Sequence, residues 1–204
     1  IRLIKTNSTN EIASHTYSHL CCSEKGINIE QFKADMECYR DIAEDNDINV
    51  KSMVFPRNQY AQEYLDCLNT YGISSFRGNA KHWLHKNGHL IKGGLAGRAI
   101  RLIDYYLPIT SNIYNQKDLA KGNSLLDIPA SIFLRPWSKK LNLLENQRIK
   151  RIKSLMTNAA KKQLLFHLWW HPHNFGINQE ENFYLLSDIL THFKKLKKLY
   201  GMKS

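Results

Sequence analysis

The chain has 204 residues and a net charge of +11, with 43% hydrophobic and 11% aromatic residues. This length and apolar content suffice for a folded domain with a substantial core, and they exclude a disordered chain. No apolar run approaches the roughly 20 residues of a membrane-spanning helix, so we expect no transmembrane segment. None of the four cysteines has Cys-x-x-Cys spacing, which slightly favours a reducing, cytoplasmic compartment: Cys21, Cys22, Cys38 and Cys67.

Short strand-like runs alternate with helical stretches, a pattern typical of a mostly parallel α/β fold. In the first half we expect the end of a helix over 1–9, strands over 11–14, 52–55 and 73–77, and helices over 28–45 and 59–71. The glycine-rich residues 78–124 are the least regular, with a helix predicted over 98–106. In the second half we expect a strand over 125–134 bent at Pro129, a basic helix over 142–162, a strand over 164–170 and a last helix capped by Asn178. No repeat or linker divides the chain, so we expect one domain over residues 1–204.

The most informative stretch is His15-Thr16-Tyr17-Ser18-His19, which follows a short buried strand. If the chain enters a helical turn at Thr16, the side chains of His15 and His19 project to the same side. Two neutral imidazoles form half of a zinc-type site, which typically adds a carboxylate and an open water position. The spacing alone leaves a plainer alternative open, in which one histidine packs in a core and the other is solvated.

The whole segment Glu11–His19 resembles the His-[Ser/Thr]-x-x-His motif of the polysaccharide deacetylases (carbohydrate esterase family 4), with its usual Glu-Ile-Ala-Ser lead-in. The resemblance implies a divalent metal, with zinc expected, on His15, His19 and an Asp from an earlier Asp-Asp motif. No Asp precedes His15, and the first Asp in the chain is Asp35. We therefore expect the third ligand to come from a missing N-terminal segment of the same protein. The implied fold is a distorted (β/α) barrel of about seven strands, with its first strands missing from this chain.

A second block, Val54–Tyr60, stands where this family carries an Arg-Pro-Pro-Tyr-Gly-like motif. The resemblance implies that Arg57 orients a catalytic-base Asp through an ion pair. Arginine suits this task because its planar guanidinium group stays charged and can bind both oxygens of a carboxylate. It also implies that Tyr60 lies at the substrate and that the nearby backbone holds the oxyanion. Asn58 and Gln59 replace the two prolines, which leaves the loop geometry open. The plainer alternative for Arg57 is a surface arginine after a strand.

A third block, Leu165–Phe175, resembles the closing Leu-x-His motif, whose histidine protonates the leaving amine from the end of a late strand. His171 stands at that strand end and is the predicted general acid. His167 lies inside the apolar run, so we interpret it as a core residue, and His173 is a weaker rival to His171.

Other residues have less specific assignments. Trp169 and Trp170 alternate faces if extended, so one is expected in the core, and we assign Trp170 to the sugar pocket. The family's Asp-x-x-Asp-Trp-like stretch is not recognisable, and its candidates stay ambiguous: Asp104, Asp127 and Trp83. A glycine-rich setting argues against a second metal site at three further histidines: His82, His85 and His89.

The implied function is that of a metal-dependent hydrolase that removes N-acetyl groups from a sugar or polysaccharide substrate, with this chain alone inactive. One alternative is a catalytically inactive, deacetylase-like protein that binds carbohydrate. Another is a basic nucleic-acid-binding α/β protein, since residues 139–162 carry eight Lys or Arg and one acid, and five lysines follow near the end. Such stripes can serve nucleic acid, anionic glycans or acidic lipid headgroups, but a solvated helix face is the plainer interpretation. Because no nucleic-acid motif is present, we do not expect nucleic acid as the partner.

Overall fold

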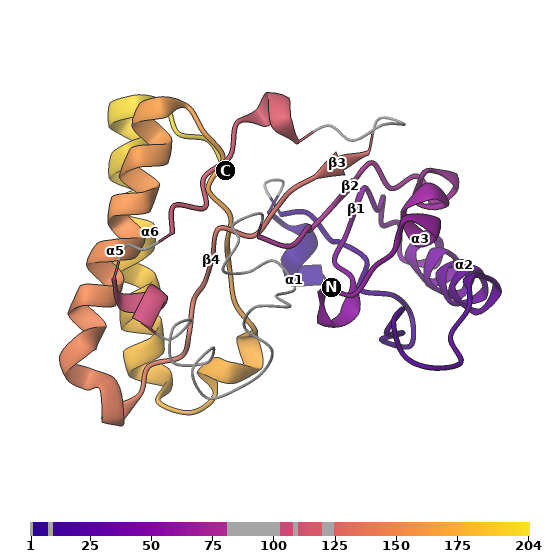
Figure 1. The fold of residues 1–204 in the computed structure, drawn as a ribbon, viewed down its shortest axis with the longest axis horizontal. Helices are drawn as coiled ribbons and strands as arrows, with labels where there is room; N and C mark the ends of the chain where they lie inside the picture. The colour runs from indigo at the N-terminus through magenta and orange to yellow at the C-terminus, as the bar shows by residue number, and fades with distance from the viewer. Residues whose placement is uncertain (1, 8–9, 81–102, 108–109, 120–124) are drawn as a thin grey trace. The chain divides into compact units, whose positions relative to one another are not determined.

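The computed structural model describes the chain except residues 1, 8–9, 81–102, 108–109 and 120–124 (Figure 1). It divides into two compact units, unit 1 with Ile1–Gly78 and Leu119–Ile128, and unit 2 with Asn79–Asp118 and Pro129–Ser204. None of the described helices is both long and apolar enough to cross a membrane.

Unit 1 is built on a three-stranded parallel sheet. Its strands β1 (Ser52–Met53), β2 (Ser75–Phe76) and β3 (Leu126–Asp127) pair in the order β1-β2-β3. Ser14 adds an isolated parallel bridge to Met53, which places residue 14 beside the outer edge of β1. The helices of this unit are α1 (Arg2–Lys5), α2 (Ile29–Asp45) and α3 (Gln62–Asp66).

Helix α2 confirms the predicted helix over 28–45. It begins with a capping box. The Asn28 side chain accepts a hydrogen bond from the backbone nitrogen of Gln31, and the Gln31 side chain accepts one from the backbone nitrogen of Asn28, both at 3.0 Å. Two donors that the first helical turn would leave without a partner are thereby satisfied. The buried face of the helix includes Phe32, Met36 and one acid, Asp35.

The single helix expected over 59–71 is wrong, because the segment is broken into short pieces. A 3-10 turn, η1 (Pro56–Asn58), comes first, then α3, then a second 3-10 turn, η2 (Leu68–Tyr71), which Gly72 ends at φ 74°. In the second turn the backbone nitrogen and the hydroxyl of Thr70 both donate to the Cys67 carbonyl, at 3.1 and 2.6 Å. These hydrogen bonds span three residues instead of the four of an α-helix, so the segment forms a tighter 3-10 turn.

The core of unit 1 joins α2 to the sheet through aromatic rings. Phe32 stacks on Phe55 with ring centroids 6.0 Å apart, and Phe55 meets the edge of Phe76 at 6.3 Å. All three side chains are almost fully buried. Burial of each such ring contributes roughly 1.5–3 kcal/mol, so this contact fixes the helix over the strands.

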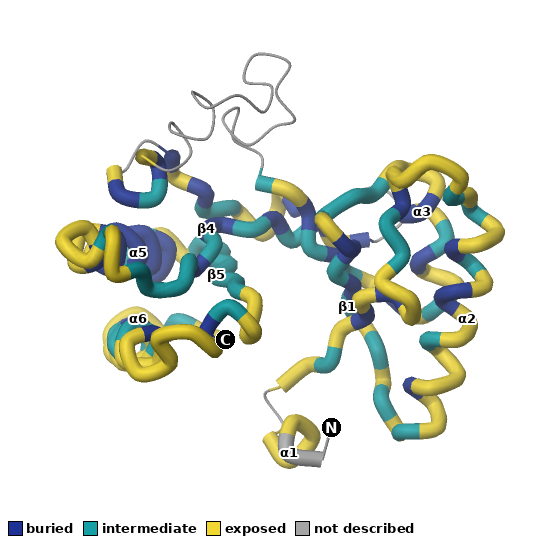
Figure 2. The backbone as a smooth tube through the Cα atoms, turned by 90° about the horizontal axis from the view of Figure 1, so that it is seen from below, coloured by how far each residue is buried: buried dark blue, intermediate teal, exposed yellow. Residues whose placement is uncertain are grey.

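Unit 2 runs β4 (Ile132–Phe133), α5 (Asn142–Lys162), β5 (Leu168–Trp169) and α6 (Gln179–Tyr200), with the two strands paired in parallel. Unit 2 also has the 3-10 turns η3 (Gln116–Asp118), η4 (Lys139–Leu141) and η5 (Pro172–Phe175). Of the helix predicted over 98–106, residues 103–106 are helical and the others lie outside the described residues. Helix α5 has the predicted bounds and a buried face along its length, with buried residues one or two at a time at helical spacing, whereas much of α6 is exposed (Figure 2).

Two buried arginines of α5 have acidic partners, as buried charges require. Arg148 pairs with Glu145 one turn earlier. Arg151 donates to Asp104 at 3.1 Å, and the same carboxylate accepts from the backbone nitrogen of Thr110 at 3.0 Å. Asp104 therefore fastens the segment before residue 110 to α5.

The start of α6 is organised by a residue other than the predicted cap. Asn178 occupies the N-cap position, but with φ 54° and no side-chain cap hydrogen bond. The buried Asn182 donates instead to the carbonyls of Ile177 and Asn178, at 2.8 and 2.9 Å. Its Oδ1 accepts from the backbone nitrogen of Trp137 at 2.6 Å. One amide thus joins the loops that follow β4 and β5.

The predicted (β/α) barrel is wrong. The described residues form five two-residue strands in a three-stranded and a two-stranded sheet, both parallel, and no barrel closes among them. The strand expected over 125–134 does bend at Pro129, but its two halves, β3 and β4, pair in different sheets. A proline cannot donate to a ladder, so pairing ends there and the chain leaves the first sheet.

Candidate functional site

The loop after Ser14 brings His15 and His19 together, but not through the expected helical turn. Thr16 and His19 have φ values of 59° and 58°, so the chain makes left-handed bends where a helical turn was expected. The two imidazole rings nevertheless lie with centroids 4.9 Å apart at an interplanar angle of 76°. Both side chains are exposed and therefore accessible to a ligand.

A residue that the sequence interpretation left without a role holds this loop. The buried Asp35 accepts from the backbone nitrogens of Tyr17 and Ser18, at 2.6 and 2.9 Å, and from the Ser18 hydroxyl. The Thr16 hydroxyl accepts from the backbone nitrogen of Leu20 at 2.8 Å. The residues between the two histidines are thus fastened to α2. The signal that could have revealed Asp35 is an acid on the buried stripe of an amphipathic helix, beside Met36.

The orientation of His15 suits a metal ligand. Its Nδ1 lies 2.6 Å from the carbonyl oxygen of Val54, directly after β1. A carbonyl oxygen only accepts, so Nδ1 carries the proton and the lone pair is on Nε2. Metal-binding histidines usually donate their other ring nitrogen to a carbonyl or carboxylate in this way.

The described residues provide two ligands, not a complete set. Among them, no group of three His, Cys, Asp or Glu side chains is placed to hold a metal ion. Two imidazoles fit half of a zinc site, and a third ligand would come from outside this part of the chain.

Arg57 has an acidic partner other than the expected base. Its Nη1 donates to Glu24 at 2.7 Å, and both side chains are more than half exposed. Arg57 and Asn58 have φ values of 53° and 54°, so the loop follows a left-handed path at the two residues next to Pro56. An exposed pair of this kind contributes little to stability and can exchange partners.

Tyr60 lies within the core layer of unit 1. Its ring is half-buried, with centroids 5.5 Å from Phe55 and 5.1 Å from Phe76. The ring therefore helps to pack the loop after β1 against the sheet.

The carboxyl edge of the sheet gathers further polar side chains. Arg77 follows β2 and donates to Asn58 Oδ1 at 2.8 Å, and burial lowers the pKa of its guanidinium. Asp127 ends β3, and a Cβ on Gly78 would lie 1.7 Å from its Oδ1, so the buried carboxylate packs directly over that glycine. Since His15 follows Ser14 beside β1, all these groups stand where parallel sheets usually present their ligand sites.

His171 follows β5 in unit 2 and belongs to a ring group in which the two histidines are exposed and Phe133 and Trp169 are half-buried. Its ring lies 5.4 Å from Trp169 and 5.8 Å from Phe133, and it stacks on His173 at 5.1 Å. Trp170 points elsewhere, since it stacks on the buried Phe175 at 6.2 Å within the core of unit 2. The tryptophan beside His171 is therefore Trp169.

The remaining candidates divide into two kinds. His167 is half-buried, and its backbone nitrogen donates to the Ser131 hydroxyl at 2.9 Å, while Asp104 has the structural role described above. Four residues lie outside the described part of the chain: His82, Trp83, His85 and His89.

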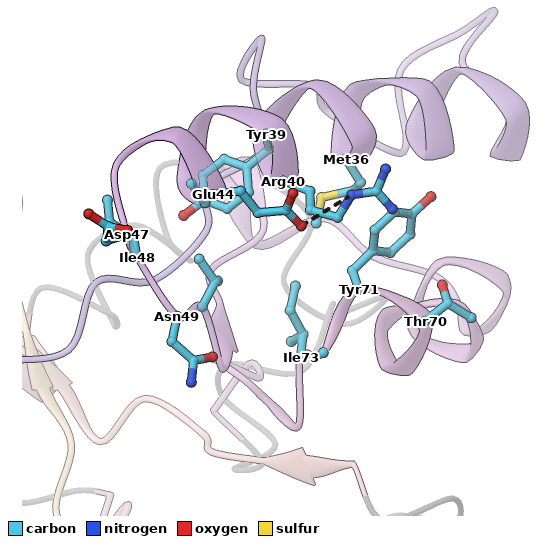
Figure 3. A pocket seen from close by; sticks show the side chains of 13 residues that line it. Met36, Tyr39, Arg40, Glu44, Asp47, Ile48, Asn49, Thr70, Tyr71 and Ile73 are labelled. Atoms are coloured by element: carbon cyan, nitrogen blue, oxygen red, sulfur yellow. Dashed lines mark ion pairs between the residues drawn. The ribbon is translucent and has the colours of Figure 1, made fainter.

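A separate pocket of about 480 Å³ lies at the amino-terminal edge of the sheet in unit 1 (Figure 3). Its floor is apolar, with Met36, Val50 and Ile73, and Arg40 faces Glu44 across 3.9 Å at its rim. None of the predicted site residues lines it.

Comparison with known proteins gives no relative, since no family model, curated protein or solved structure matches the chain.

Proposed function

We propose that this protein is a divalent-metal-dependent hydrolase that removes N-acetyl groups from a sugar or glycan, with His15 and His19 as metal ligands. The observation that supports it most is the adjacent pair of exposed imidazoles, with His15 Nδ1 held by the Val54 carbonyl. Zinc suits two imidazoles and a carboxylate better than magnesium or calcium, which prefer oxygen ligands. A carboxylate from outside the described residues completes the set in this proposal.

When bound, a divalent ion supplies a Lewis acid for the acetamide carbonyl and lowers the pKa of a water molecule. The chain's own residues have separate tasks. Asp35 keeps the two ligands in place through the loop backbone. Arg57 would leave Glu24 to hold the carboxylate of the base, and His171 would donate a proton to the leaving nitrogen.

A second candidate is carbohydrate binding without turnover. Two observations favour it: the described residues offer two metal ligands, and Arg57 is already paired with Glu24. A protein of this kind would keep the ring group around His171 as a surface on which a sugar stacks.

The test combines metal content with activity in the full-length protein. We expect about one zinc per chain by elemental analysis, and acetate release from N-acetylglucosamine oligomers. The double variant His15→Ala with His19→Ala should lose both. The matched control is Tyr17→Phe in the same loop, because only the backbone nitrogen of Tyr17 contacts Asp35.

The outcomes separate the candidates. Zinc that disappears in the double variant, without acetate release by the wild type, supports the binding protein instead. Unchanged zinc content in the double variant would overturn the assignment of His15 and His19.

A further inference from the structure

Helices α5 and α6 run in the same direction and end together. Thr157 Oγ1 lies 2.9 Å from His192 Nε2, and further along both helices Gln163 Nε2 donates to the Tyr200 carbonyl at 3.1 Å. Both views show the two helices side by side (Figures 1 and 2). The carboxyl ends of the two helices therefore form one surface.

Seven exposed lysines gather on this surface, which we call the lysine end: Lys161, Lys162, Lys194, Lys195, Lys197, Lys198 and Lys203. The sequence has no acid over 154–178 or 189–204. No described residue forms an ion pair with any of the seven. The two helix termini contribute only about half a negative charge each, so the lysine end has a strong uncompensated positive charge.

Apolar side chains are exposed among these lysines. Leu199 is 58% exposed, Leu190 47% and Tyr200 37%. At 100° per residue, Leu199 lies about 40° from Lys195, at a flank of α6, while Leu190 lies between Lys194 and Lys197 on the opposite side of the helix. Lysines interleaved with leucine and tyrosine are typical of helices that lie on a membrane surface, where the apolar groups enter the headgroup region.

We propose that the lysine end binds the surface of a bilayer that contains anionic phospholipids. Each lysine near such a surface strengthens binding, and burial of the exposed Leu199 side chain among the headgroups adds a contribution to the binding free energy that does not depend on charge. A nucleic acid would use the same lysines, but would not require Leu199. This inference does not depend on the proposed hydrolase activity.

The experiment is flotation of the purified chain with two kinds of vesicle, one of phosphatidylcholine alone and one that also contains about 30% of the anionic lipid phosphatidylglycerol, because anionic surfaces attract polybasic segments. We expect binding to the anionic vesicles only. Lys194→Gln with Lys198→Gln should weaken it by about 30-fold. Lys139→Gln with Lys140→Gln, at the opposite end of α5, removes the same charge and should change binding by less than about threefold.

A further variant distinguishes the lipid from a polyanion. Leu199→Ser keeps the charge and should weaken vesicle binding by about tenfold while leaving binding to a duplex DNA oligonucleotide unchanged. Equal losses in the two lysine pairs would mean that only net charge matters and would overturn the site. DNA binding without vesicle binding, or vesicle binding insensitive to Leu199→Ser, would overturn the membrane assignment. Circular dichroism melts check that each variant is folded.

Discussion

The buried carboxylate of Asp35 accepts a hydrogen bond of 2.6 Å from the backbone nitrogen of Tyr17, so helix α2 fixes the residue between the two histidines of the candidate site. The distance between the His15 and His19 rings therefore depends on a residue that touches neither ring. Loops that present binding residues are usually held in this way by a more rigid scaffold.

Asp35→Asn should lower the stability of unit 1 and weaken zinc binding together. The amide keeps one acceptor oxygen but loses charge-assisted bonds to the loop, at a cost of about 1.5–3 kcal/mol. Urea unfolding and zinc titration measure the two effects. Asp45→Asn, at the exposed end of α2, makes the same charge change and should alter neither. Zinc affinity that stays at the wild-type value in Asp35→Asn would show that the loop does not need this anchor.

Gly78→Ala should destabilise the protein by about 1–3 kcal/mol, because the new Cβ would lie 1.7 Å from Asp127 Oδ1 and either the carboxylate or the backbone at residue 78 would have to move. Adding Asp127→Ala should recover part of the loss, which a double-mutant cycle in urea measures. Gly176→Ala is the control, since its nearest neighbour would be 3.4 Å away at an ordinary helical φ of −63°. Purely additive effects of the two changes at positions 78 and 127 would contradict the close contact.

His171→Ala should lower kcat for deacetylation in the full-length protein by roughly 10²–10⁴-fold while sparing metal binding, if this histidine is the general acid. Its exposed ring can be removed without opening a cavity, so the melting temperature should change little. His167→Ala should act mainly through stability, because that side chain is half-buried. A kcat that survives His171→Ala but collapses in His173→Ala would move the acid to the neighbouring, stacked histidine.

Cys22 should be the slowest cysteine to react with N-ethylmaleimide. Burial raises the pKa of its thiol to about 12, and the thiolate is the reactive form. At pH 8 roughly one molecule in 10⁴ then carries the thiolate, and this fraction rises with pH. Cys38 is exposed and should react first, as mass spectrometry of timed samples can show. Similar rates for the two in folded protein would contradict the burial of Cys22, whereas similar rates in urea are expected.

The sequence predicted the long helices well, because their signals are local. The capping residue Asn28 and the apolar repeat of α5 lie within a few residues of what they determine. The barrel failed for the opposite reason. Which strand pairs with which is decided by contacts across the chain, such as Met53 with Phe76, and two-residue strands leave little pattern from which to infer them.

The candidate site was likewise predicted where its signal is local and missed where it depends on contacts between distant parts of the chain. The spacing of His15 and His19 suggested that they share a site, and the rings do lie together. The reason is not helical periodicity but a tie from Tyr17 to Asp35, eighteen residues away in the sequence. Trp170 illustrates the converse, since alternation along a strand cannot tell which of two neighbouring tryptophans faces Phe175 and the core.

Asn182 has a consequence for any sugar that meets the rings around His171. Its side chain ties the backbone after β4, at Trp137, to the backbone after β5, at Ile177, so the two segments that carry Phe133 and His171 are held before a ligand arrives. Ordering a mobile loop on binding costs conformational entropy, and little of that cost remains when the loop is already fixed. Weak stacking contacts can then appear as measurable affinity, and replacing Asn182 should reduce that affinity without touching a single ring.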